Sequence, residues 1–279
     1  MIKPIKKEEA LLKEIKESAK KSEGLRIWWL GQSGFLVQWN GFHLLLDPYL
    51  SDCLTKKYAN TEKQHVRMSE LVISPEKLNF IDLVTSSHNH TDHLDAETLN
   101  PILEANPEIQ FIIPEANRDF VAERLGCNRN LPIGLNDQQS YFLNENISLT
   151  AIPSAHNDFE TDETGQHKFL GYIIKIGPYC IYHSGDTLWY EGLEKKVIPF
   201  KPDVLLLPIN GNKPERKIAG NMSSEEAAKF GKTVGSGFVI PHHYHMFEFN
   251  TEDPENFVQA AKKEGINYQA LKIGERFEK

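Results

Sequence analysis

Three histidines and an aspartate fall within six consecutive positions of the segment SSHNHTDHLD, residues 86–95. They are His88, His90, Asp92 and His93, and they directly follow the apolar run IDLVT. Imidazole and carboxylate groups are the ligands that zinc, manganese and iron accept in proteins. In extended backbone, residues two apart project to the same side, so His88 and His90 can bind one ion together. Asp92 and His93 lie beyond the turn and can approach a neighbouring ion. The alternative interpretation is a polar loop that contains three of the 11 histidines by chance. It is the weaker one, because ligands cluster at strand ends, where loops carry function on a rigid scaffold.

The elements before this segment are predicted to be a helix followed by short strands. Charged and apolar residues alternate with helical spacing near the start, which predicts a helix over residues 3–22. RIWWLG, GFLVQW and FHLLLD then read as three strands, and Asn40-Gly41 between the last two is a strong hairpin signal. Residues 48–80 are polar and irregular and could cover a site. IDLVTSS is the next buried strand, and it ends in the histidine-rich segment.

Strands and helices alternate through the rest of the chain. We expect a helix over 95–105, a strand at QFIIP and a helix over 115–125. The strands SYFL, ISLTAIP, FLGYIIKI, YCIYHSGD, DVLLLPIN, GFVIPHH and LKIG follow, with helices beginning near Ser223 or Ser224 and near Pro254. No linker divides the chain, so we expect one domain over residues 1–279. Two β-rich halves that each carry helices indicate the α/β (α+β) class and a four-layer αββα sandwich.

Composition limits the classes of function. The net charge of -8 argues against binding the phosphate backbone of nucleic acid, although local cations could still attract a small anion. The three cysteines form no CxxC motif and indicate a reducing compartment. The N-terminus lacks an apolar signal core, and no apolar run is long enough to span a bilayer. We therefore expect a cytoplasmic protein that binds neither nucleic acid nor a membrane.

The HxHxDH pattern of residues 88–93 resembles the signature of the metallo-β-lactamase superfamily. The resemblance covers most of residues 25–275, because later ligands of that superfamily match His156 in IPSAH, Asp186 in YHSGDT and His243 in VIPHHYH. Taken alone, a residue such as His156 or Asp186 would more often be structural. Only the agreement with the order of the superfamily's ligands along the chain changes that interpretation. The resemblance implies two metal sites. The first comprises His88, His90 and His156, the second comprises Asp92, His93 and His243, and Asp186 bridges them.

Four further stretches, WWLGQSG, YHSGDT, GNMSSEEAA and VIPHHYHMF, are similar to the branch that contains L-ascorbate-6-phosphate lactonase. The same branch pattern, Ile-Pro-any-His, selects His243 over His242 as the ligand. Adjacent residues of a strand face opposite ways, so only one of the two can point into the site.

Other polar residues at strand ends are candidates for supporting roles. Asp47 and His183 could accept or donate hydrogen bonds behind the ligands, because metal-bound imidazoles usually bond a second partner. Candidates for either supporting or substrate contacts are His242, Tyr244, His245 and Asn210. Lys213, Arg216 and Lys217 could supply cations for an anionic substrate, although a solvated loop explains them more simply. His43, His65 and His167 lack a matching context and are expected to be structural or exposed.

The resemblance implies a metal-dependent hydrolase with two divalent ions per chain, zinc or manganese rather than iron. A hydroxide held at the dinuclear site would open an ester or lactone bond, with Asp92 orienting it as the catalytic residue. The substrate is expected to be a small molecule, such as a sugar-phosphate-type lactone, and the protein could be an oligomer. The alternatives are a phosphodiesterase similar to N-acyl phosphatidylethanolamine phospholipase D and a non-catalytic metal-binding scaffold. An iron oxidoreductase similar to the flavodiiron proteins is disfavoured, since they carry Glu where this chain has His90.

Overall fold

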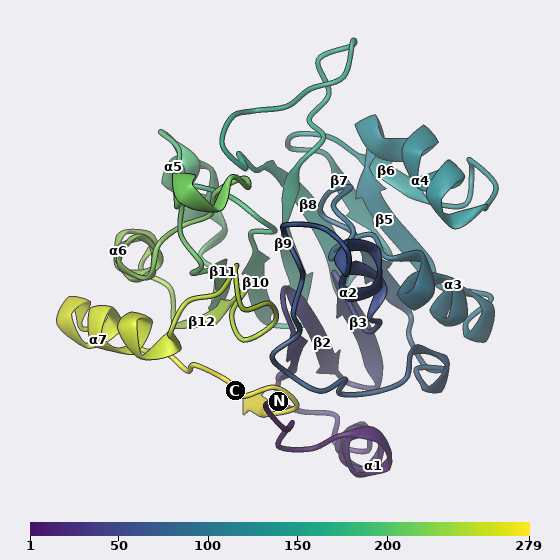
Figure 1. The fold of residues 1–279 in the computed structure, drawn as a ribbon. Coiled ribbons are helices and arrows are strands. Elements are labelled where there is room, and N and C mark those ends of the chain that lie inside the picture. Colours follow the sequence, from purple (N-terminus) through teal and green to yellow (C-terminus); the bar gives the residue numbers. More distant parts are fainter.

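Two β-sheets stacked face to face, with helices on their outer sides, form the body of the protein (Figure 1). The structure is a computed structural model that describes residues 1–279. The first sheet has the strand order β13-β1-β2-β3-β4-β5-β6 and the second has the order β12-β11-β10-β9-β8-β7. In Figure 1, α3 and α4 lie beside the first sheet, whereas α6 and α7 lie beside the second. The predicted αββα sandwich is confirmed.

The element boundaries follow the predicted alternation closely. The first sheet comprises β1 (Arg26–Gly31), β2 (Gly34–Trp39), β3 (Phe42–Leu46), β4 (Leu83–Thr85), β5 (Gln110–Pro114), β6 (Ile133–Leu135) and β13 (Arg276–Glu278). The second comprises β7 (Ser140–Phe142), β8 (Ile147–Pro153), β9 (Leu170–Ile176), β10 (Tyr179–His183), β11 (Val204–Pro208) and β12 (Phe238–His242). The helices are α1 (Glu8–Ser18), α2 (Cys53–Tyr58), α3 (Ala96–Ala105), α4 (Arg118–Leu125), α5 (Leu193–Val197), α6 (Ser224–Val234) and α7 (Pro254–Glu264). No helix is long and apolar enough to cross a bilayer.

The hairpin between β2 and β3 turns at the predicted pair. Asn40 and Gly41 have φ angles of 46° and 77°, and Trp39 pairs directly with Phe42. Two successive positive φ angles are the mark of a type I′ turn, whose twist matches that of the flanking strands. The Asn-Gly sequence thus sets the register of the strand that ends beside the metal centre.

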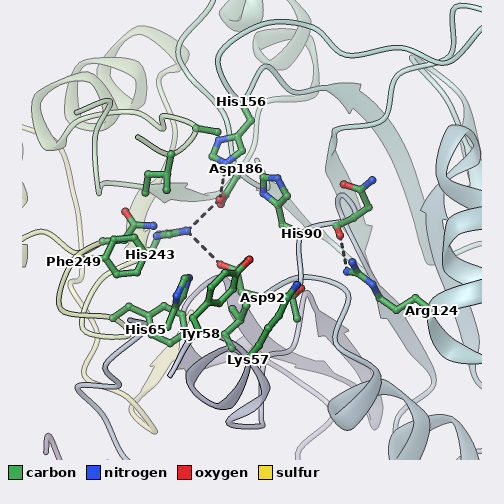
Figure 2. A pocket seen from close by; sticks show the side chains of 17 residues that line it. Lys57, Tyr58, His65, His90, Asp92, Arg124, His156, Asp186, His243 and Phe249 are labelled. Atoms are coloured by element: carbon green, nitrogen blue, oxygen red, sulfur yellow. Dashed lines mark hydrogen bonds and ion pairs between the residues drawn. The ribbon is translucent and has the colours of Figure 1, made fainter. Parts of the chain in front are cut away.

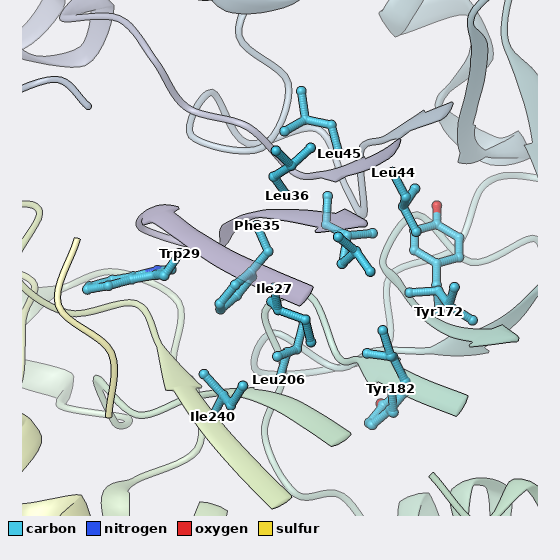
Figure 3. Packing of buried hydrophobic residues seen from close by; sticks show 14 of the residues in the cluster. Ile27, Trp29, Phe35, Leu36, Leu44, Leu45, Tyr172, Tyr182, Leu206 and Ile240 are labelled. Carbon is cyan, nitrogen blue, oxygen red and sulfur yellow. The ribbon is translucent and has the colours of Figure 1, made fainter. Parts of the chain in front are cut away.

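The hydrophobic core lies mainly between the two sheets (Figure 3). Ile27, Phe35 and Leu44 from the first sheet face Tyr182 and Leu206 from the second. Every residue of β1 and β11 is buried, so these strands are covered on both faces. Double coverage explains why their sequences are continuous apolar runs rather than alternating patterns. The adjacent Trp28 and Trp29 of β1 both contribute buried indoles to this core.

Two predicted elements differ from the structure at the chain ends. Helix α1 spans Glu8–Ser18 and is shorter than the predicted range of 3–22. Residues before it are tied to other segments, with the Ile2 amide donating to the Met68 carbonyl at 2.7 Å and the Ile5 amide to the Ile273 carbonyl at 2.8 Å. The prediction of a strand at LKIG is wrong, because Gly274 has a φ of 76° and sits in a turn. The last strand is β13, which pairs antiparallel with β1 at the sheet edge.

Strands from both sheets end at one edge of the sandwich. In the first sheet, β3 runs parallel to β4. In the second sheet, β10, β11 and β12 all run parallel to one another. β1 and β3 are both antiparallel to β2, and β8 and β10 are both antiparallel to β9. Strands β1, β3 and β4 of one sheet and β8, β10 and β12 of the other therefore present their carboxyl ends together. Side chains that follow these ends can meet even though the chain separates them widely.

Helix α6 anchors the loop that enters this edge. The Ser223 hydroxyl accepts a hydrogen bond from the Glu226 amide at 3.2 Å, and the Glu226 carboxylate accepts one from the Ser223 amide at 2.8 Å. This reciprocal capping box satisfies two amides that the first helical turn leaves free. Ser223 also pairs with Asn210, so the cap fixes the helix to the loop after β11.

We predict that Ser223→Ala lowers the free energy of unfolding by about 1 kcal/mol, because the N-cap hydroxyl is lost. Urea unfolding followed by circular dichroism measures this change. Thr233→Ala is the matched control, since Thr233 is exposed near the end of the same helix and its loss is expected to change stability by less than about 0.5 kcal/mol. Equal effects of the two variants would show that the capping box does not stabilise α6.

Candidate metal centre

A cavity of about 380 Å³ opens at the edge where these strands of both sheets end (Figure 2). Five of the seven predicted metal ligands line it, namely His90, Asp92, His156, Asp186 and His243. The other two, His88 and His93, are buried behind them, with 1% and 0% of their surface exposed. The structure therefore brings together residues that are up to 155 positions apart (88 to 243).

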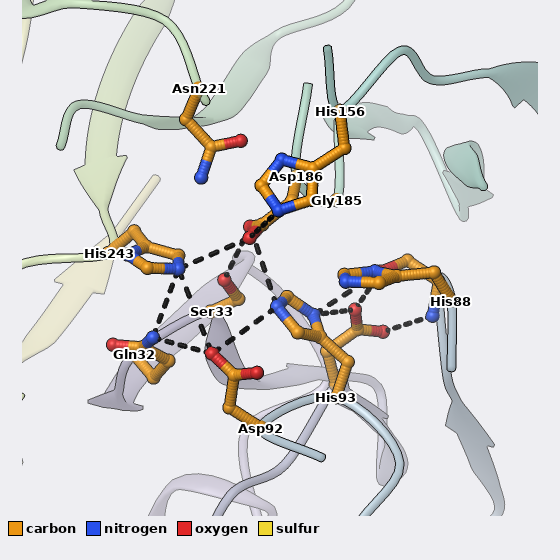
Figure 4. A network of polar contacts seen from close by, with 12 residues as sticks. Gln32, Ser33, His88, Asp92, His93, His156, Gly185, Asp186, Asn221 and His243 are labelled. Carbon is orange, nitrogen blue, oxygen red and sulfur yellow. Dashed lines mark hydrogen bonds and ion pairs between the residues drawn. The ribbon is translucent and has the colours of Figure 1, made fainter. Parts of the chain in front are cut away.

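The predicted ligands form two groups that could each hold a metal ion. The ligand atoms of His88, His90 and His156 lie within 4.8 Å of one another, and so do those of Asp92, His93 and His243. Asp186 lies between the groups (Figure 4). Its Oδ2 is 3.6 Å from Nε2 of His156 and 3.2 Å from Nε2 of His243, and its Oδ1 is 3.4 Å from Nε2 of His93. This is the arrangement that a bridging carboxylate requires.

The buried imidazoles fit a metal better than they fit a protein partner. Nε2 of His88 and Nε2 of His93 are buried and make no hydrogen bond. Each ring uses its other nitrogen, since Nδ1 of His88 lies 3.0 Å from the Ser87 hydroxyl and Nδ1 of His93 lies 2.7 Å from Asp47. A buried polar atom without a partner is costly. Coordination of a cation by each of these Nε2 atoms would remove that cost.

For His88, His156 and Asp186 the electrostatics favour the protonation states that metal ligands need. Burial lowers the pKa of His88 and of His156, so both rings are neutral near pH 7 and offer a lone pair. Burial alone would raise the pKa of Asp186, but His243 and His93 hold it well below its ordinary value. Burial alone would lower the pKa of His93, yet the carboxylates of Asp186 and Asp92 raise it well above its usual value. A cation bound at the centre would interact with these carboxylates in place of the proton on His93, and Nε2 of His93 would then be available as a ligand.

Asp47, the residue that follows β3, contacts His93 on the ring edge away from the two groups. This fully buried carboxylate accepts hydrogen bonds from the Thr85 hydroxyl at 2.8 Å, the Ser87 amide at 3.0 Å and the Ser87 hydroxyl. Its contact with Nδ1 of His93 fixes the ring so that Nε2 faces the centre. The ligand atoms of Asp47, His88 and His93 also lie within 4.8 Å of one another and form a third group that could hold a metal ion. Hydrogen bonds from Thr85 and Ser87, however, occupy both oxygens of Asp47.

Two contacts that the sequence analysis did not anticipate orient the remaining ligands. Nδ1 of His156 donates to the Gly220 carbonyl at 2.7 Å, which turns Nε2 toward Asp186. The amide nitrogen of Gln32 lies 2.7 Å from Oδ2 of Asp92 and 3.0 Å from Nε2 of His243. Gln32 follows β1 in the WWLGQSG stretch, and its place at a strand end was the available signal for it.

The structure separates His243 from His242 as the strand geometry requires. His243 lines the cavity, whereas His242 points into the core, where Nδ1 lies 3.1 Å from the Ser33 hydroxyl and its ring stacks on His183. His183 in turn donates from Nε2 to the Ser33 carbonyl at 3.0 Å. Ser33 lies 3.4 Å from Asp186 and thus links His183 and His242 to that carboxylate.

The other proposed substrate contacts lie away from the cavity. The Tyr244 ring packs on Trp29 with centroids 4.3 Å apart, and its hydroxyl donates to the Leu271 carbonyl. Neither Tyr244 nor His245 lines the cavity. Asn210 is buried and donates to Asn250 at 2.9 Å, so it contacts a lining residue rather than the cavity itself.

The predicted loop cations are engaged elsewhere. Lys213 pairs with Glu252 at 2.9 Å, Arg216 donates to the carbonyls of Asn210 and Thr251, and Lys217 does not line the cavity. The cations that do line it are Lys57 and Arg124, which the sequence analysis missed. His65 lines it as well, although it was expected to be structural or exposed. These three residues lie far from the histidine motif in the chain, and no local pattern marks them.

Comparison with known proteins decides the family. A model of the beta-lactamase superfamily domain matches residues 26–243. The chain belongs to the metallo-β-lactamase superfamily. Within this superfamily it is 31% identical over 229 residues to a UPF0173 metal-dependent hydrolase of Caldivirga maquilingensis, an alignment that covers 82% of this chain and 86% of the relative. A UPF0173 metal-dependent hydrolase of Methanosarcina mazei is 29% identical over 247 residues, covering 85% and 91% of the two chains. The predicted superfamily is thus confirmed.

Solved structures show the same metallo-β-lactamase fold at lower identity. Igni18, a metallo hydrolase from Ignicoccus hospitalis, superposes with a TM-score of 0.67 and 21% identity over 92% of this chain and 98% of its own. An isothiocyanate hydrolase from Delia radicum gut bacteria superposes with a TM-score of 0.71 and 19% identity over 90% and 98%. At these identities the likeness concerns the fold.

We predict that the metallo-β-lactamase centre takes up about two metal ions per chain and that Asp186→Ala loses at least one, because the variant lacks the carboxylate between the two groups. Inductively coupled plasma mass spectrometry on purified protein measures the content. Asp137→Ala is the control, since Asp137 pairs with Lys196 outside the centre. Full metal content in Asp186→Ala would refute the bridging role.

We also predict that Asp47→Asn weakens metal affinity by about 10- to 100-fold, because an amide supports the His93 ring less well than a carboxylate does. Asn tolerates the φ of 39° at this position. Competition with a chromogenic chelator measures the affinity. Asp82→Asn, which alters an exposed carboxylate bonded to the His43 amide, should retain wild-type affinity. Unchanged affinity in Asp47→Asn would argue against the supporting role.

Proposed function

We propose that this protein is a metal-dependent hydrolase that opens an ester or lactone bond of a small molecule. The observation that carries the proposal is the pair of His/Asp groups around Asp186 on the wall of an open cavity. Two divalent ions bound there, zinc or manganese, would generate hydroxide near pH 7 and polarise the substrate carbonyl. The names of the UPF0173 relatives support metal-dependent hydrolysis. The choice of an ester or lactone bond rests on the resemblance of WWLGQSG, YHSGDT, GNMSSEEAA and VIPHHYHMF to the ascorbate-6-phosphate lactonase branch.

Asp92 is the residue of the chain best placed to orient the attacking water. Burial alone would raise its pKa, but His93 and His243 lower it, so the carboxylate is ionised. Its Oδ2 accepts a hydrogen bond from Gln32 at 2.7 Å. Its Oδ1 has no protein partner and is free to accept a hydrogen bond from water in the cavity. The side chain is thus held at one oxygen and available at the other.

The seven ligands explain why such a centre would be a strong Lewis acid. Five are imidazoles, which supply affinity without cancelling the charge of the metals. The two carboxylates lie where bridging and orientation need them. An all-carboxylate set would neutralise more of the charge on which polarisation of a carbonyl depends.

A substrate panel combined with elemental analysis tests the proposal. We predict that protein with about two ions per chain hydrolyses a lactone or carboxylic ester, and that Asp92→Asn lowers kcat by about 100-fold or more while metal remains bound. Asp137→Asn is the matched control. Turnover of a phosphodiester but not of esters or lactones would favour the phosphodiesterase class. Full metal content without turnover of any substrate class would favour a binding scaffold.

A further inference from the structure

Two cations of the cavity wall, Arg124 of α4 and Lys57 of α2, have no acidic partner. Neither side chain forms an ion pair with any carboxylate of the chain, although the protein carries 39 acidic residues and a net charge of -8. Neighbouring cations are paired, since Lys56 contacts Glu97 at 2.8 Å and Arg118 contacts Glu115 at 2.7 Å. Arg124 and Lys57 are thus unpaired cations on the wall of the cavity that a ligand would enter.

Arg124 is held in one orientation by backbone carbonyls. Its Nη1 donates to the Asn89 carbonyl at 2.6 Å and to the Leu94 carbonyl at 3.2 Å, and its guanidinium lies 4.4 Å from the centroid of the Phe120 ring. Nε and Nη2 have no partner in the protein. This free edge carries two parallel N–H groups, the fork that binds carboxylate or phosphate oxygens in pairs. Asn89 is one residue from His90, so the contact places the fork beside the metal centre.

Lys57 extends from α2 along the same wall. Its ammonium lies 5.2 Å from the centroid of the Tyr58 ring, and no carboxylate contacts it. Figure 2 shows Arg124 on one side of His90 and Asp92, with Lys57 reaching up from below. The Lys57 ammonium and the free edge of the Arg124 guanidinium line one cavity. Together they can bind a single anionic group.

The opposite wall of the cavity is apolar and aromatic. Phe249 lies across the centre from Arg124 (Figure 2). Phe247 and Phe249 meet the His65 ring edge to face at 5.0 and 4.7 Å, and His65 stacks on Tyr58 at 4.3 Å. These rings hold one another, and Lys57 lies over the outermost of them, Tyr58. The cavity wall therefore runs from the two cations, past Tyr58 and His65, to Phe247 and Phe249.

We propose that the substrate is an ester or lactone with an anionic group, a carboxylate or a phosphate, that Arg124 and Lys57 bind while the scissile carbonyl lies over the metal centre. This inference rests on the proposed hydrolytic function. In the reaction, the water oxygen bonds to the carbonyl carbon, the bond from that carbon to the leaving oxygen breaks, and the leaving oxygen takes up the proton. The anionic group takes no part in these bond changes and serves to place the carbonyl.

The experiment compares lactones that share one ring and differ in the substituent at C5: γ-butyrolactone, its 5-carboxylate and its 5-(phosphooxymethyl) derivative. For wild-type protein, we expect kcat/KM to be larger for an anionic lactone than for the neutral one. Arg124→Met and Lys57→Met should each reduce that preference by about tenfold or more, mainly through KM, since each removes a charge-assisted hydrogen bond. The carboxylate and phosphate compounds show which anion is preferred.

Lys56→Met and Lys213→Met are matched controls, because both cations are paired with glutamates and lie outside the cavity. Both should keep the wild-type preference. A wild-type protein without preference for either anionic lactone, or variants with an unchanged preference, would overturn the anion site while leaving the hydrolase proposal intact.

A binding measurement separates the two proposals if no lactone is turned over. Isothermal titration calorimetry of metal-loaded protein compares 2-hydroxyglutarate with 4-hydroxybutyrate, the products of the carboxylated and neutral lactones. Tighter binding of 2-hydroxyglutarate that is lost in Arg124→Met would support the anion site even though the proposed hydrolysis had failed. Equal affinity for the two products would overturn it.

Discussion

The buried carboxylate of Asp186 is the constraint on which this structure depends. Only 3% of its surface is exposed, and three imidazoles surround it, those of His93, His156 and His243. An isolated charge at such a depth would be very costly, so the groups around it must be both close and well oriented. They follow three different strands of two sheets, and the sandwich can satisfy this one carboxylate only if the carboxyl ends of those strands meet.

The chain bends sharply where it delivers these side chains. Gln32, Asp47 and His243 have φ angles of 48°, 39° and 66°, which non-glycine residues seldom adopt. Each directly follows a strand and each contacts the centre. Unfavourable backbone geometry persists where the surroundings determine it, and it gathers at functional sites. Here it turns a side chain inward at the first position beyond a strand.

Strand and helix positions were largely predictable because apolar runs and turn residues act locally. The Asn40-Gly41 turn and the Ser223 cap are examples, since a few adjacent residues determine each. The prediction of a strand at LKIG failed for the converse reason. Its backbone bonds to remote parts of the chain, the Ile273 carbonyl to the Ile5 amide and the Gly274 amide to the Trp29 carbonyl, and it forms a turn. The seven proposed ligands could be named because they lie at strand ends in a familiar order. Arg124 and Lys57 could not, since helices with no motif bring them to the cavity.

The aromatic wall of the cavity has a small core of its own. Tyr49, Leu54, Met246 and Phe247 pack together as a cluster separate from the large core between the sheets. Two members of this cluster, Leu54 and Phe247, line the cavity. The segment after β3 and the loop after β12 thus pack against each other at the cavity wall. Substitutions there would change the shape of the entrance, and with it the set of molecules that fit, at positions other than the seven proposed ligands.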